Sequence, residues 1–174
     1  MKCFAAFALT LAATPAAADT AHHGQHSPYA GQEAREIKAL SPEEIADLAA
    51  GRGMGLALAA ELNGYPGPRH VLDLAQELQL TMEQQQKTNA LFEAMRTETS
   101  ALGAELIEAE RALDHLFAEK HATPETVAAA TERAGSIEAK LRAAHLRYHL
   151  AMIEVLTTDQ VTAYNHLRGY ATYH

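Results

Sequence analysis

The sequence predicts an all-α protein in which a long antiparallel α-hairpin is flanked by short helices. Its 174 residues include 37 Ala and 21 Leu, but only 9 Val and Ile together and no Trp. Ala and Leu enter a helix at little entropic cost, whereas β-branched and aromatic residues favour sheets. The chain carries 22 acidic and 14 basic residues. This balance argues against nucleic acid as a partner, because phosphate binding needs a basic surface.

Residues 1–18 have the three regions of a secretory signal. Lys2 is followed by an apolar run over 3–11 and then by small residues that end at Ala18. This order of basic, apolar and small-residue regions is typical of such signals, so we expect cleavage after Ala18 and export. No later segment has the roughly 20 uninterrupted apolar residues of a membrane helix. We therefore predict no membrane span.

A flexible arm is predicted over residues 19–40, of which 19–31 show no helical periodicity. It contains three histidines that either bind a metal ion or belong to a soluble tail: His22, His23 and His26. Residues 41–79 are expected to form short helices. Ser41 and Glu44 have the spacing of a capping box around Pro42, which starts the first of these helices. The predicted helices, separated by turns rich in glycine and proline, are 42–50, 54–62 and 68–78.

The hairpin is predicted from two long segments without internal proline, 82–120 and 124–155, with Thr123 capping the second. In the first segment a 4,3 spacing marks the side that faces its partner: Leu91, Met95, Glu98, Leu102, Leu106, Ala109, Leu113 and Leu116. The facing residues of the second segment are Ile137, Leu141, Ala144, Tyr148, Met152 and Val155. Glu98 is the one charged residue on these facing sides.

A repeated motif, Leu-Thr-x-x-Gln, precedes two of the predicted helices. Its copies lie 76 residues apart, and their defined positions are Leu80, Thr81 and Gln84, then Leu156, Thr157 and Gln160. Each copy has the pattern of an N-terminal capping box, in which Thr is the N-cap, Gln reaches back to it, and the preceding Leu packs against the helix.

Two such motifs around a long helical hairpin, in an exported chain, resemble the Spy and CpxP family of periplasmic stress proteins. The resemblance covers roughly residues 78–168 and places a hairpin domain over 80–174. It implies an ATP-independent periplasmic chaperone, a cradle-like homodimer that binds unfolded clients and limits their aggregation. One family member also modulates an envelope-stress sensor. On this resemblance the six motif residues brace the hairpin ends.

The resemblance also brings an alternative function. Related proteins bind zinc, nickel or copper, so the chain is alternatively a periplasmic metal-resistance or metal-sensor protein. This chain departs from the family in one respect. The family's client surface is often basic, whereas residues 82–155 of this chain hold 8 basic and 12 acidic residues.

A second apolar stripe is predicted on the hairpin, opposite the side that faces its partner. It consists of Leu146, Leu150 and Ile153, with Arg142 and Arg147 nearby. This stripe either binds clients or packs on residues 42–78 or on a second copy of the chain. A single hairpin cannot bury a second apolar face by itself, which favours a homodimer unless the short helices cover that face.

A metal site is the competing interpretation of the same region. His145 and His149 are one helical turn apart, and a hairpin turn centred near Ala122 puts Glu98 at their level. A carboxylate in an apolar interface needs a partner. We expect either a pair between Glu98 and His145 without metal, or a site for zinc, copper or nickel formed by Glu98, His145 and His149.

No enzymatic activity and no required cofactor are predicted. The single cysteine, Cys3, lies in the expected signal, and the Gly-x-Ser-x-Gly, His-Glu-x-x-His and phosphate-loop motifs do not occur. The carboxylates are spaced as on the solvent-facing side of a helix.

Overall fold

The computed structural model describes residues 27–170, whose regular structure is entirely helical. The predicted signal peptide, the three arm histidines and the last four residues of the predicted hairpin domain lie outside these residues. The chain divides into two compact units at Gly31 and Gln32. In the first, residues 27–31 form a turn closed by a hydrogen bond from the Ala30 N–H to the Ser27 carbonyl. None of the helices in the described residues has the length and apolar character needed to cross a membrane.

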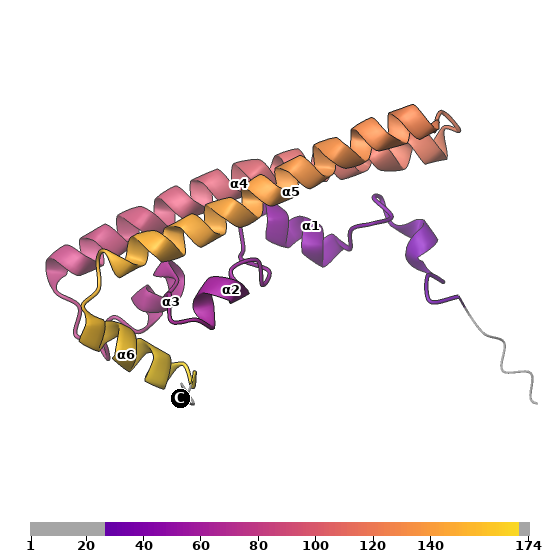
Figure 1. Ribbon diagram of the computed structural model, residues 1–174. Helices are drawn as coiled ribbons and strands as arrows, with labels where there is room; N and C mark the ends of the chain where they lie inside the picture. Colours follow the sequence, from indigo (N-terminus) through magenta and orange to yellow (C-terminus); the bar gives the residue numbers. More distant parts are fainter. Residues whose placement is uncertain (1–26, 171–174) are drawn as a thin grey trace, which may run out of the picture. The chain divides into compact units, whose positions relative to one another are not determined.

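The long hairpin dominates the second unit and confirms the predicted fold class. Helices α4 (Met82–Ala118) and α5 (Pro124–Ile153) run antiparallel side by side, and α6 (Thr158–Leu167) follows them (Figure 1). Thr123 caps α5, as predicted. Helix α4 ends two residues before the predicted boundary because Lys120 has a φ of 61°, a left-handed conformation that ends a helix.

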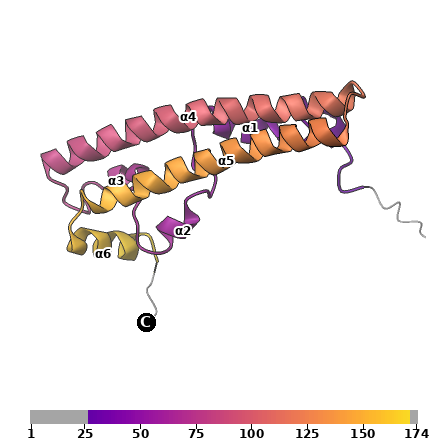
Figure 2. The same ribbon diagram turned by 45° about the horizontal axis from the view of Figure 1, so that its top comes forward.

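The short helices pack against this hairpin. A 3-10 helix, η1 (Gln32–Ala34), precedes α1 (Pro42–Ala49), α2 (Leu58–Glu61) and α3 (Pro68–Asp73). Helices α1 and α3 contact α4, while α2 and α3 contact α5 (Figure 2). The predicted capping box of α1 is present, with Ser41 and Glu44 each accepting the other's backbone N–H.

Two of the short helices are shorter than predicted. Residues 54–57 turn instead of joining α2, because Met54 and Gly55 have φ values of 45° and 78°. Helix α3 ends at Asp73, and a series of turns then leads to Gln79, whose φ is 50°. These turns bring the chain back toward the start of α4.

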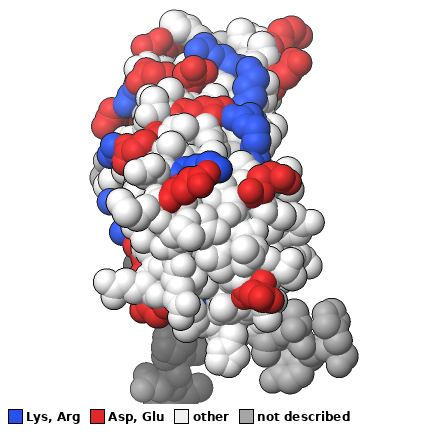
Figure 3. All heavy atoms as spheres, turned by 90° about the vertical axis from the view of Figure 1, so that its left-hand side faces the viewer, with Lys and Arg blue, Asp and Glu red and all other residues white. Residues whose placement is uncertain are grey.

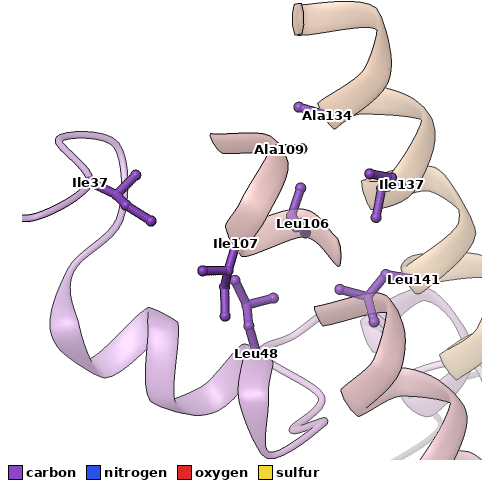
Figure 4. Packing of buried hydrophobic residues seen from close by; sticks show 8 residues of the cluster. All are labelled: Ile37, Leu48, Leu106, Ile107, Ala109, Ala134, Ile137 and Leu141. Carbon is purple, nitrogen blue, oxygen red and sulfur yellow. The ribbon is translucent and has the colours of Figure 1, made fainter. Parts of the chain in front are cut away.

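One core cluster joins α1 to the middle of the hairpin. Leu48 of α1 lies beside Ile107 of α4, and Leu106 lies on the side of the α5 residues (Figure 4). The fully buried Ile37 also belongs to this cluster. The prediction that the flexible arm extends to residue 40 is therefore wrong. Ile37 is held by apolar packing, and the Lys38 N–H donates a hydrogen bond to Asp114. The other members of the cluster are Ala109, Ala134, Ile137 and Leu141.

A second core cluster forms where α3, α6 and the two repeated motifs meet. The motif leucines, Leu80 and Leu156, are both buried in it. The other buried members are Val71, Leu78, Met152 and Tyr164. Each motif leucine thus packs as the sequence predicts, and together they fix the end of the hairpin at which α4 begins.

Candidate functional site

The two repeated motifs are joined directly through their glutamines. Gln84 Nε2 donates to Gln160 Oε1 at 2.8 Å, and Gln160 Nε2 donates to Gln84 Oε1 at 3.0 Å. Each amide oxygen also accepts the N–H of its own N-cap threonine, Thr81 or Thr157. The remaining amide hydrogens go to backbone carbonyls, from Gln84 to Val155 and from Gln160 to Leu78. All the donors and acceptors of both amides are used, so the motif is a clasp between the two helix starts as well as a pair of caps.

The variant Gln84→Glu separates the clasp from the cap, because a glutamate can still accept the Thr81 N–H but cannot donate to Val155 or Gln160. We expect it to lower the free energy of unfolding by about 1–2 kcal/mol, since two part-buried hydrogen bonds are lost. Urea denaturation measures this change. The reverse exchange Glu44→Gln in the exposed capping box of α1 is the control, expected to change stability by no more than about 0.5 kcal/mol. Equal effects of the two exchanges would show that the glutamine pair contributes nothing beyond capping.

A buried polar cluster lies between α2 and the C-terminal part of the chain. Glu61 of α2 is 7% exposed, and its Oε1 accepts hydrogen bonds from the hydroxyls of Tyr164 at 2.5 Å and Tyr170 at 3.1 Å. Arg168 Nε lies 3.5 Å from the same oxygen. Burial, reinforced by the bond to Glu61, raises the pKa of Tyr164 far above its ordinary value, so this hydroxyl stays protonated and acts as a donor.

Two histidines of α5 line the same region. His149 Nδ1 lies 2.7 Å from the backbone oxygen of Tyr65 and 3.7 Å from Glu61 Oε2. Because a carbonyl oxygen only accepts, Nδ1 carries the proton in this hydrogen bond. Burial and the nearby His149 lower the pKa of His145. The close approach of residues 65–67 depends on Gly67, where a Cβ would lie 2.8 Å from the His149 ring.

These residues border a cavity of about 620 Å³. Its lining includes Glu61, His145 and His149, together with several large apolar side chains and four arginines. Two buried polar atoms of its lining residues have no hydrogen-bond partner in the described part of the chain, Glu61 Oε2 and His145 Nε2. A cavity of this size with a few polar groups is typical of a small-molecule site.

The predicted partner of Glu98 is wrong. Glu98 accepts hydrogen bonds from Arg147 and from the Tyr148 hydroxyl, the latter at 3.0 Å, instead of pairing with His145. The hydrogen bond from Arg147 lowers the pKa of Glu98, and the Tyr148 bond acts in the same direction. Among residues 27–170, no three His, Cys, Asp or Glu side chains are grouped so as to hold a metal ion. The predicted group of Glu98, His145 and His149 is therefore not assembled, because Glu98 pairs with Arg147 and Tyr148, whereas the two histidines line the cavity.

The predicted apolar stripe is only partly exposed. Leu150 is 57% exposed, whereas Leu146 and Ile153 are half-buried. Neither core cluster of the described residues includes any of the three. Arg142 is exposed, and Arg147 pairs with Glu98.

Sequence reasoning missed the polar cluster around Glu61. A signal for it was present, since Glu61 is the one charged residue in the apolar run from Leu56 to Leu62. Tyr164 and Arg168 carried no comparable signal, because their approach to Glu61 depends on how α6 folds back.

Comparison of the chain with family models, with curated proteins and with solved structures gives no match.

Proposed function

We propose that this protein is an ATP-independent chaperone of the bacterial periplasm that binds unfolded proteins and limits their aggregation. The observation that carries the proposal is a group of large apolar side chains left exposed around the contact between α2 and α5. The doubled motif and its resemblance to the Spy and CpxP proteins support the same function. That resemblance also implies a homodimer and contact with an envelope-stress sensor, which stay predictions.

The exposed group, which we call the α2–α5 surface, consists of Leu62, Tyr65 and Leu150, with exposed fractions of 58%, 39% and 57%. Contacts of their neighbours place them in one region. Leu62 follows Glu61 and Leu150 follows His149, and the two neighbours lie 3.7 Å apart. The Tyr65 carbonyl is bonded to His149. Exposed apolar side chains next to one contact between elements favour binding of unfolded chains, which expose apolar residues of their own.

The surface near the motifs suits the same function. The end of the molecule at which α4 begins carries a broad area without charged side chains, bordered by mixed acidic and basic groups (Figure 3). Met82, the first residue of α4, is 78% exposed. Weak charge and exposed apolar groups favour contact with many sequences over recognition of one.

The experiment is a light-scattering assay in which a substrate protein unfolds and aggregates without nucleotide. Wild type is expected to suppress scattering at equimolar concentration. The double variant Leu62→Ser, Leu150→Ser is expected to act about tenfold more weakly, because each half-exposed leucine contributes apolar area to client binding. Both sites are exposed, so we expect helicity to be unchanged.

Phe117→Ser is the matched control for this assay. Phe117 is 55% exposed, near the other end of α4 from the motifs. It should retain the wild-type activity. Equal suppression by the double variant and wild type would contradict the assignment of clients to the α2–α5 surface.

A further inference from the structure

We propose that the cavity beside α2 binds a small organic carboxylate whose apolar body carries a hydroxyl group. This inference goes beyond the proposed chaperone function and does not depend on it. The cavity volume of about 620 Å³ suits a molecule of this size. Three properties of the lining carry the inference: its charge, its apolar side chains and its unpaired buried atoms.

The charge of the lining selects an anion. Four arginines and one glutamate line the cavity, in a chain whose net charge is −8. Arg168 pairs with the glutamate itself. The other three arginines each pair with one acidic residue outside the lining, and their side chains are 58–64% exposed: Arg52 with Asp47, Arg69 with Asp73 and Arg96 with Glu93. A guanidinium has five N–H donors, so one acidic partner leaves donors for a ligand carboxylate.

The apolar part of the lining suits an apolar, ring-sized body. Four large apolar side chains contribute to the lining: Met54, Leu58, Phe92 and Met95. The Arg69 guanidinium lies over the Phe92 ring at 5.8 Å from its centroid, so a positive charge adjoins the apolar wall. A ligand that joins an apolar body to an anionic group matches this arrangement.

Two buried polar atoms of the lining residues call for a hydroxyl. Glu61 Oε2 and His145 Nε2 have no hydrogen-bond partner in the described residues, and their residues are 7% and 2% exposed. Buried polar groups are almost always hydrogen-bonded. A hydroxyl donates to a carboxylate oxygen and accepts from a protonated imidazole nitrogen, so a ligand hydroxyl can pair with either atom. A water molecule forms the same hydrogen bonds, so ligands with and without the hydroxyl are compared to test this part of the proposal.

Calorimetric titration of the full chain with three probes tests the proposal. The probes are 4-hydroxycinnamate, cinnamate without the hydroxyl, and 4-hydroxycinnamyl alcohol without the carboxylate. We expect saturable 1:1 binding of 4-hydroxycinnamate and about tenfold weaker binding of each of the other two, because each lacks one polar contact. Absence of saturable binding by 4-hydroxycinnamate, or equal affinity of the acid and the alcohol, would overturn the proposal.

Matched variants locate the site. In the triple variant Arg52→Gln, Arg69→Gln, Arg96→Gln, we expect at least about tenfold weaker binding of 4-hydroxycinnamate, with the alcohol unaffected. The control Lys87→Gln, Arg133→Gln, Lys140→Gln removes the same charge from exposed helix positions outside the cavity and should bind as wild type does. Equal weakening in both would show that net charge alone attracts the probe and would overturn the site. Circular dichroism verifies that both variants are folded. The titration contains no unfolded client protein, so its result does not depend on the outcome of the chaperone assay.

Discussion

Replacing Glu61 with alanine is expected to lower the free energy of unfolding by about 2–4 kcal/mol, because a buried carboxylate that holds several hydrogen-bond donors is removed. The Glu61 side chain is only 9% exposed. Its Oε1 accepts the hydroxyl of Tyr164, which is fully buried, and lies beside Arg168. Alanine would leave that hydroxyl without its acceptor and the guanidinium without its carboxylate. Urea denaturation in the absence of ligand measures the loss.

Glu98→Ala is the matched control, because the Glu98 carboxylate also binds an arginine and a tyrosine hydroxyl. Its side chain is 36% exposed, and that of its partner Arg147 is 60% exposed. Solvent screens such a pair, so we expect a loss of no more than about 1 kcal/mol. Similar losses for the two variants would contradict the view that burial makes the Glu61 cluster a major contribution to stability.

Gly103→Ala is expected to destabilise the protein by about 1–2 kcal/mol, although alanine is the better helix former. A Cβ at Gly103 would lie 2.1 Å from the Leu48 carbonyl oxygen and 2.7 Å from its carbonyl carbon. Both are backbone atoms of α1, so the whole helix must move away from α4. Overpacking costs about 1–3 kcal/mol, and the clash with backbone atoms places this site in the upper part of that range, above the gain of about 1 kcal/mol in helix propensity.

Gly135→Ala is the control for Gly103→Ala and is expected to have the opposite effect on the free energy of unfolding. Gly135 also lies inside a long helix, α5, but nothing lies within 4 Å of a Cβ built there. We therefore expect it to stabilise the protein by about 0.5–1 kcal/mol. Thermal or urea unfolding of the two variants compares them directly. Stabilisation by both would mean that α1 does not pack closely on Gly103.

Features encoded within a few consecutive residues could be predicted from the sequence. The capping boxes need only a threonine or serine and a residue three positions later, and the structure confirms those at Ser41, Thr81 and Thr157. The turn also allowed us to predict which residues of the two hairpin helices lie opposite each other. Glu98 meets Arg147 and Tyr148, which lie between His145 and His149, the level expected from the turn.

Features that depend on distant parts of the chain could not be predicted. The prediction placed Glu98 at the correct height along α5 but gave it the wrong partner. The rotation of each helix about its axis decides which side chains meet, and the sequence pattern did not reveal that rotation. His145 and His149 face the short helices, since α2 and residues 65–67 pack there. The clasp between Gln84 and Gln160 likewise requires two helix starts, 76 residues apart, to meet in space.

The most direct test of the proposed function is the binding of an unfolded client at equilibrium. A reduced and carboxymethylated protein, which stays unfolded, carries a fluorescent label and is titrated with the wild-type chain in the absence of nucleotide. We predict a saturable rise in anisotropy for this unfolded client, and none for the same protein with its disulfides and fold intact. Failure to bind the unfolded form, or equal affinity for the unfolded and folded forms, would contradict the chaperone function.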